Sequence, residues 1–317
     1  MTTLLRAPTR PYHTPIMDSG RWDGYQPRAG DIVVATFPKC GTTWTQRIVD
    51  LLIHQSPDPR PIMETYPWLD ATFFAPVEEN LATLEAQTHR RAIKSHLPFD
   101  SLPLFGDVKY IHVARDGRDA ALSWHNHQQG FTEEAKRRVA VANGWDPASG
   151  PPPPPENPRD HFVEWLGQAE GGGAGPTADE LPFFEYEMTY WRERRRPNLL
   201  LVHYADLKAD LPGEMRRIST FLEIDTPDDL LAKLAEAAHF ESMKSQGAKL
   251  LPKIGEMFDR GHDRFLNKGT NGRWKDVLTA DDLARYANLV SQRLSPAAAA
   301  WIEKGRLGAG DPFTAAD

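Results

Sequence analysis

Residues 31–44 read Asp31-Ile-Val-Val-Ala-Thr-Phe-Pro-Lys-Cys-Gly-Thr-Thr-Trp44, and the fold we expect follows from this stretch. Its apolar first part ends abruptly at Pro38-Lys39-Cys40-Gly41, and a helix-like run continues to His54. The pattern predicts a buried strand over residues 31–36, a tight turn and the start of a helix. Such a turn directs unpaired backbone N–H groups and the positive helix end to one point, beside Lys39. The stretch therefore predicts an anion site.

The turn differs from the common nucleotide-binding loop, in which a glycine lies five residues before a Gly-Lys-Ser/Thr ending. Here Thr36 stands in place of that glycine, and Lys39 lies two residues before Gly41. This difference argues against magnesium-assisted ATP chemistry. On local sequence alone, an ordinary strand-to-helix turn with a solvated lysine remains the alternative.

The composition is that of a globular protein, with 317 residues, 40% hydrophobic and 26% charged. We interpret residues 1–317 as a single domain with an N-terminal arm over residues 1–30. There is no apolar run of about 18 residues that could span a bilayer. A single cysteine excludes an internal disulfide and fits a cytoplasmic location. The net charge of −7 argues against nucleic-acid binding, so we expect a small anionic ligand and neither a nucleic acid nor a membrane as partner.

Two further stretches repeat the strand, turn and helix pattern. Residues 108–114 precede Arg115, and residues 199–203 precede Tyr204. The repetition predicts an α/β fold with a central parallel sheet flanked by helices, of P-loop-like nucleotide-binding type. Ligands of such sheets bind at the carboxyl ends of the strands, so Lys39, Arg115 and Tyr204 should converge.

The remaining chain is mostly helical in pattern, with one irregular segment. A loop insertion is expected over about residues 143–180, because it holds five consecutive prolines (151–155) and a glycine-rich run (171–175) around a short helix-like stretch. It falls where a gate for an acceptor could lie. The helices we expect cover residues 44–54, 78–87, 183–196, 204–221, 227–238 and 279–293, the last with Thr279 as N-cap.

Lys94 and His96 lie two residues apart and would share one side of an extended segment. A histidine with a pKa near ~6.5 can take a proton from a hydroxyl group at neutral pH. A lone histidine is more often structural, and nothing local distinguishes this one among 11. Arg115 and Ser123, two helical turns apart, suit the binding of one phosphate, although a merely charged helix start is the alternative.

Taken together, these stretches resemble the cytosolic sulfotransferases, which use 3′-phosphoadenosine 5′-phosphosulfate (PAPS), and a bacterial member is expected. The resemblance spans about residues 20–290 and follows the family's motif order. It rests on Phe37-Pro-Lys-Cys-Gly-Thr-Thr-Trp44, Lys94-Ser-His-Leu-Pro98, Val113-Ala-Arg115 through Ser123, Tyr204-Ala-Asp-Leu-Lys208, Phe240-Glu-Ser-Met243 and Phe265 through Lys275.

The resemblance implies transfer of a sulfuryl group from PAPS to a hydroxyl, without a metal. His96 would be the general base, with Lys39 and Lys94 as further catalytic residues. The residues implied to bind PAPS are Lys39, Cys40, Gly41, Thr42, Thr43, Trp44, Arg115, Ser123, Tyr204, Phe240, Met243, Asn267, Lys268 and Gly269. From the residues themselves, a small aromatic or apolar acceptor is expected, with pocket candidates Tyr66, Trp68, Phe73, Phe74, Phe131 and Trp145, although such aromatics are also normal core.

The chain departs from the family pattern at three places. Cys40 stands where the family often has serine, and Asn267 replaces the usual arginine before Lys268-Gly269, which predicts weaker binding of the nucleotide. The family's dimer signature is only partly present, because Ala280 and Ala284 replace a valine and a glutamate. A monomer and a homodimer both remain open.

Two other functions stay open at this point. One is a kinase-like phosphoryl transferase, against which the displaced lysine argues. The other is a non-catalytic PAPS-binding module, against which the presence of both Lys39 and His96 argues.

Overall fold

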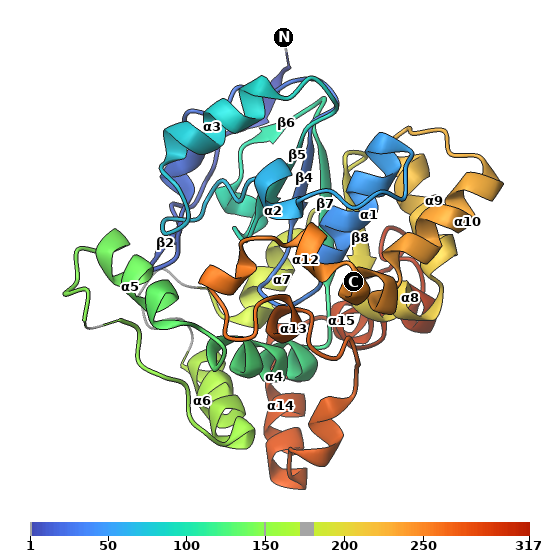
Figure 1. Cartoon of the computed structure of the whole chain (residues 1–317). Coiled ribbons are helices and arrows are strands. Elements are labelled where there is room, and N and C mark those ends of the chain that lie inside the picture. The colour runs from blue at the N-terminus through green and yellow to red at the C-terminus, as the bar shows by residue number, and fades with distance from the viewer. Residues whose placement is uncertain (1, 149, 172–180) are drawn as a thin grey trace.

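The computed structural model describes residues 2–148, 150–171 and 181–317, and a four-stranded parallel sheet forms its centre (Figure 1). The strand order is β5 (Ala92–Ser95), β4 (Ile32–Ala35), β7 (Lys109–Ala114) and β8 (Leu199–His203). All three neighbouring pairs are parallel, so the four carboxyl ends share one edge. The predicted α/β fold with a central parallel sheet is confirmed.

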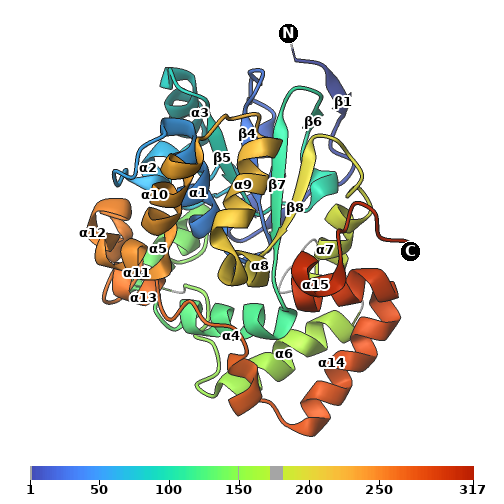
Figure 2. The same ribbon diagram turned by 90° about the vertical axis from the view of Figure 1, so that its right-hand side faces the viewer.

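The sheet is buried on both faces, which explains why its strands are almost continuously apolar. Along β4, Val33 and Ala35 belong to one hydrophobic core, and Ile32 and Val34 belong to another. Because successive side chains of a strand point to opposite faces, this alternation assigns one core to each side of the sheet. Figure 2 shows α1, α9 and α10 on one side and α7 and α15 on the other.

The helices that follow the strands begin at the shared edge. They include α1 after β4, α4 after β7 and α8 after β8, and α4 lies across the carboxyl ends of the strands (Figure 2). The helices are α1 (Thr42–His54), α2 (Ile62–Thr65), α3 (Val77–Ala86), α4 (Gly117–Gln128), α5 (Glu133–Ala142), α6 (Pro158–Glu170), α7 (Phe183–Trp191), α8 (Tyr204–Ala209), α9 (Leu211–Phe221), α10 (Asp228–Ala238), α11 (Phe240–Ser245), α12 (Gly247–Leu250), α13 (His262–Phe265), α14 (Ala280–Arg293) and α15 (Pro296–Ala309).

The N-terminal segment is built into the fold. Strand β1 (Leu4–Arg6) pairs with β6 (Leu104–Phe105), and β2 (His13–Thr14) pairs with β3 (Met17–Asp18). This segment also places four side chains in the core, namely Tyr12, Met17, Trp22 and Tyr25. Residues 2–30 therefore cover the sheet and contribute to its core.

Several helices differ from those predicted. The helix expected over residues 204–221 is two helices, because Asp210 ends α8 and its side chain caps α9 by accepting the N–H of Gly213. Within residues 143–180, helix α6 is longer than expected, and residues 149 and 172–180, with most of the glycine-rich run, lie outside the described part. Thr279 does cap α14, in a capping box with Asp282, as predicted.

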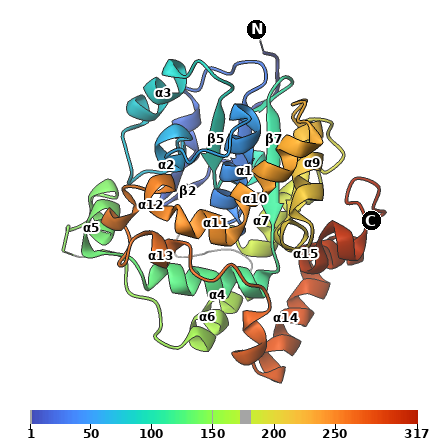
Figure 3. The ribbon, with the colours of Figure 1, turned by 45° about the vertical axis from the view of Figure 1, so that its right-hand side comes forward.

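The segment from α11 to α13 passes between α1 and α4 (Figure 3). It is held to the end of α4 by backbone hydrogen bonds, because Thr132 donates to the carbonyl of Met257 and Asp259 donates to that of Gly130. The segment thus forms one wall beside the edge where the strands end. No helix within residues 2–148, 150–171 and 181–317 has the length and apolar character needed to cross a bilayer.

Candidate active site

A cavity of about 550 Å³ lies at the carboxyl ends of the strands. It is lined by Lys39 after β4, His96 after β5, Arg115 after β7 and Tyr204 after β8. The predicted convergence of the residues that follow the strands is therefore observed.

The turn after β4 adopts an unusual backbone conformation. Lys39 has φ 71° and Gly41 has φ 113°, both in the left-handed region. A Cβ on Gly41 would lie 2.9 Å from the ring of Tyr204, so a side chain does not fit there. Gly41 is also the N-cap of α1, and no side chain of the described residues caps this helix. The first N–H groups of α1, at Thr42, Thr43 and Trp44, are thereby left for an anion.

Lys39 lines the cavity, and no carboxylate among the described residues pairs with it. Its Nζ lies 2.9 Å from Nδ1 of His127 and 5.0 Å from the centre of the Phe265 ring. Desolvation, followed by the charges of Lys94 and Arg115, lowers the pKa of Lys39 to about 7. An anion in the cavity would relieve this repulsion.

His96 is held in one tautomer by its hydrogen bonds. Its Nδ1 lies 2.7 Å from the carbonyl oxygen of Thr36, and because a carbonyl only accepts, Nδ1 carries the proton. The Nε2 lone pair is then free, and among the described residues Nε2 has no hydrogen-bond partner. Burial, and then Lys94, keep the pKa of His96 well below its usual value, although the bond to Thr36 opposes this. The ring is therefore neutral at neutral pH and able to accept a proton.

Lys94 lies beside His96, and its Nζ is 3.9 Å from the centre of the Trp68 ring. Burial lowers the pKa of Lys94 to about 8, while the nearby Asp70 raises it. Asp70 organises this corner, because its carboxylate accepts the backbone N–H of His96 (3.0 Å) and the indole N–H of Trp68 (2.7 Å). The side chains of Lys94 and His96 thus share one anchored frame.

Arg115 forms a second positive corner of the cavity. Its guanidinium donates to the carbonyls of Thr270 (2.9 Å) and Lys39 (3.2 Å) and stacks 4.2 Å from the Tyr204 ring centre. Its buried Nε has no partner among the described residues, which leaves a donor for a ligand. Ser123, on α4, lines the same cavity.

All but one of the remaining predicted nucleotide residues also line the cavity. They are Gly41, Thr42, Thr43, Trp44, Tyr204, Phe240, Met243, Asn267, Lys268 and Gly269. The indole of Trp44 is fixed by donation to the carbonyl of Ala238 at 2.8 Å and by an edge contact with Tyr204. Gly269 has φ 60°, and a Cβ there would lie 2.6 Å from the Phe240 ring.

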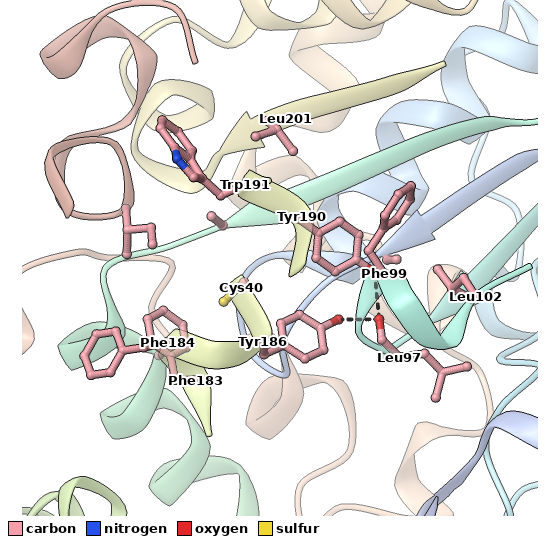
Figure 4. Packing of buried hydrophobic residues seen from close by; sticks show 14 of the residues in the cluster. Cys40, Leu97, Phe99, Leu102, Phe183, Phe184, Tyr186, Tyr190, Trp191 and Leu201 are labelled. Atoms are coloured by element: carbon pink, nitrogen blue, oxygen red, sulfur yellow. Dashed lines mark hydrogen bonds between the residues drawn. The ribbon is translucent and has the colours of Figure 1, made fainter. Parts of the chain in front are cut away.

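Cys40 does not line the cavity, contrary to its predicted place among the nucleotide residues. Its thiol is fully buried in the hydrophobic core, in the part of the core formed by Phe183, Phe184 and Tyr186 (Figure 4). Burial raises the pKa of this thiol well above its usual value. An apolar environment suits a neutral thiol, which explains why this position tolerates cysteine.

Five of the six acceptor candidates line the cavity: Trp68, Phe73, Phe74, Phe131 and Trp145. Tyr66 does not line it, and its prediction is corrected. Its ring is buried in the core around α1, where its hydroxyl donates to Asp50 at 2.8 Å. A buried hydroxyl needs such a partner, and Asp50 supplies it away from the cavity.

Several lining residues were missed from the sequence. They include His127, Arg273 and residues 14–17. The proline run also lines the cavity, and the carbonyl of Pro155 accepts from Nε2 of His125 at 2.7 Å. His127 lies one helical turn after Ser123, a spacing that would have placed it on the same face of α4.

An uncapped helix end, a cluster of cations and a histidine with a free ring nitrogen in one cavity define an enzyme that transfers a charged group from an anionic donor. Comparison with known proteins specifies the family. A family model described as "Sulfotransferase domain" matches residues 29–296, and the chain belongs to that family.

Among characterised relatives, the "Glycolipid sulfotransferase" of Mycobacterium bovis is 36% identical, over 94% of this chain and 95% of that protein. "Sulfotransferase 1B1" of Canis lupus familiaris is 24% identical, over 86% of each chain. The fold is similar to that of retinol dehydratase in complex with androsterone and inactive cofactor PAP (TM-score 0.64, 23% identity, 86% and 82% of the two chains). Mouse sulfotransferase SULT7A1 complexed with PAP is likewise similar (TM-score 0.63, 22% identity, 87% and 88%). The predicted enzyme class, a sulfotransferase, is confirmed.

Proposed function

We propose that this sulfotransferase takes its sulfuryl group from PAPS and transfers it to a hydroxyl of an amphiphilic acceptor of the glycolipid class. The observation that carries the proposal is the convergence of Lys39, Lys94 and His96 on one cavity beside an uncapped helix end. When bound, PAPS supplies the sulfuryl group, and the bridging oxygen stays with the departing 5′-phosphate. Residues of the cavity hold this donor and take the proton of the acceptor.

The cavity residues fit a ligand with two anionic ends. The helix N–H groups of Thr42 and Thr43 suit the 5′-phosphosulfate, whereas Arg115, Ser123 and Lys268 suit the 3′-phosphate. The unpaired Nε of Arg115, among the described residues, supports binding of an anion at the position proposed for the 3′-phosphate. Between these ends, the rings of Trp44 and Phe240 lie in the lining, where they suit an adenine.

His96 is proposed as the general base. Its Nδ1–H is committed to Thr36, so Nε2 takes the proton of the acceptor hydroxyl. The ammonium of Lys39 donates to the departing oxygen, and that of Lys94 stabilises charge on the transferred group. In this proposal the lysines and the helix end carry the electrostatic stabilisation, without a metal.

The acceptor proposed here is larger than the small aromatic or apolar compound expected from the sequence. It is supported by the mycobacterial relatives, which are named for glycolipids, and by the aromatic and proline residues that line the cavity. A glycolipid offers both a sugar hydroxyl for His96 and a lipid part for an apolar wall such as Trp68, Phe73 and Phe74.

The test is transfer of a radiolabelled sulfuryl group from PAPS to a panel that contains a glycolipid, the free sugar of that glycolipid, a steroid and a simple phenol. We expect the glycolipid to have the highest kcat/KM, and the sugar without lipid to be at least about tenfold poorer, because burial of a few methylenes contributes this much. A higher kcat/KM for the phenol or steroid would contradict the acceptor class. Magnesium-dependent turnover of ATP in place of PAPS would contradict the donor.

A further inference from the structure

We propose that His127 is a positioning residue for Lys39, whose ammonium it holds in the site by accepting a hydrogen bond at Nδ1. The proposal rests on the function proposed above for the role of Lys39. No motif of the sequence pointed to His127. The proposal depends on the contacts that His127 makes with Lys39 and with the aromatic side chains around it.

Lys39 has an exceptional set of neighbours for a lysine. Among the described residues, His127 is the one hydrogen-bond partner of its Nζ, at 2.9 Å, and no carboxylate pairs with it. The charges that act on it are those of the cations Lys94, from β5, and Arg115, from the end of β7. The titratable groups of Cys40, in the core, and His96, in the cavity, also interact with its charge. Repulsion and desolvation both favour the neutral amine, so an acceptor is needed to retain the charged form.

His127 is suited to be that acceptor because it is itself neutral. Burial, followed by the charges of Lys39, Lys94 and His96, lowers its pKa well below the usual value. A neutral imidazole with its proton on Nε2 offers the Nδ1 lone pair to an ammonium, which only donates. A second cation at this position would repel Lys39, and a carbon side chain would leave it without a partner.

The ring is held rigidly enough to aim Nδ1. It stacks on Trp124 with ring centres 5.4 Å apart and contacts Phe258 at 4.5 Å and Phe131 at 5.2 Å. Phe265 contacts both partners, at 5.7 Å from the His127 ring and 5.0 Å from Nζ of Lys39. These aromatic side chains come from α4, from the turn that follows it and from the segment around α13, so both walls of the cavity position the pair.

Two substitutions separate the hydrogen bond from the shape of the ring. His127→Phe keeps an aromatic ring in the box but removes the acceptor. His127→Asn loses the ring but places an amide oxygen close to the position of Nδ1. If the acceptor matters, the asparagine variant resembles the wild type and the phenylalanine variant does not.

The readouts are the affinity for PAP (3′-phosphoadenosine 5′-phosphate) by calorimetry between pH 6 and 9, and the pH profile of kcat/KM for PAPS, which reports groups of the free enzyme. Both quantities should fall as pH rises through the pKa of Lys39, because the cation is lost. In His127→Phe an unpaired buried N–H favours the neutral amine, so this fall should move to lower pH by about one unit. In His127→Asn it should stay within about 0.3 unit of the wild type.

An unchanged profile in His127→Phe, or an equal shift in both variants, would overturn the proposal. Thermal unfolding of the free variants verifies that each is folded. If the wild type binds PAP but transfers no sulfate, the proposed function fails while the PAP titrations still decide the role of His127. If sulfate transfer occurs and the pH profile of His127→Phe coincides with that of the wild type, the proposed function stands and the role of His127 is refuted.

Discussion

The carboxylate of Asp119 accepts the backbone N–H of Gly272 at 2.8 Å and that of Arg273 at 3.2 Å, although 153 residues separate Asp119 from Gly272. These bonds tie the segment that carries Asn267, Lys268 and Gly269 to α4, next to Arg115. Asp119, which looks in the sequence like part of a charged helix start, is therefore a strut that positions one wall of the cavity.

Replacing this strut should weaken nucleotide binding. In Asp119→Ala, two hydrogen bonds from backbone N–H groups to a carboxylate are lost, so we expect PAP affinity by calorimetry to fall about tenfold. Asp116→Ala is the matched control, since Asp116 caps the same helix and pairs with Arg118 without touching the segment. The control should lower thermal stability but leave PAP affinity within about twofold. Equal affinity losses in both variants would refute the strut.

The general-base role of His96 predicts a selective loss of turnover. His96→Ala should lower kcat by about 10²–10⁴-fold, while the KM for PAPS changes little, because the ring contacts Trp68 on the side of the cavity proposed for the acceptor. His13→Ala removes an exposed histidine and should keep wild-type kinetics. Turnover of His96→Ala within about threefold of wild type would exclude this role.

We expect Lys39 to lower the stability of the ligand-free protein. Its pKa of about 7 in the folded state lies below the usual 10.5, so between these values the unfolded chain binds the proton more tightly. Wild-type stability should therefore rise with pH across this window, as far as Lys39 is concerned. Lys39→Met lacks this dependence, and its midpoint of thermal unfolding should exceed that of wild type at pH 7 by about 3 °C or more.

The advantage of Lys39→Met should shrink toward pH 9.5, and sulfate transfer should be lost at every pH. A variant less stable than wild type at pH 7, or a gap that grows with pH, would contradict this account. The measurement is calorimetric or fluorescence-monitored unfolding of the ligand-free proteins.

Asn267 and Arg273 should have opposite effects on nucleotide affinity. Both line the cavity with Lys268, and among the described residues the Arg273 guanidinium has no hydrogen bond or ion pair. Burial, and then the charge of Arg115, lowers the pKa of Arg273, although the carboxylate of Asp119 opposes this. We expect Asn267→Arg to bind PAP about threefold to tenfold more tightly, and Arg273→Gln to bind it more weakly by a similar factor.

The double variant with both changes should recover affinity close to that of wild type if the two arginines serve the same phosphate. Increasing salt should weaken the binding by Asn267→Arg more steeply than that by wild type. No gain of affinity in Asn267→Arg would show that its side chain does not reach the ligand.

Much of the site could be predicted from local patterns in the sequence. A buried parallel strand has a nearly continuous apolar sequence, and Lys39, Arg115 and Tyr204 each follow such a run, so their meeting follows from the geometry of a parallel sheet. The N-cap of α14 at Thr279 was likewise readable, because a capping box depends on residues three apart. Features that depend on only a few neighbouring residues can therefore be predicted from the local sequence.

Other features depend on which way a side chain points once the chain has folded. Tyr66 and Cys40 were assigned to the cavity by their neighbours in sequence, yet both lie in the core, one bonded to Asp50 and the other among aromatic rings. Composition cannot separate a lining aromatic from a core one, since both are apolar and buried.

By itself, the sequence determined the parallel sheet and the turn after its first strand, because each follows from short-range order along the chain. The family, and with it the choice of His96 among 11 histidines, followed from the resemblance of several motifs in order. Only the tertiary structure decided the partner of Lys39, the strut from Asp119 to Gly272 and the free ring nitrogen of His96. These are hydrogen bonds between segments far apart in sequence, and their distances exist only after packing has fixed every wall of the cavity.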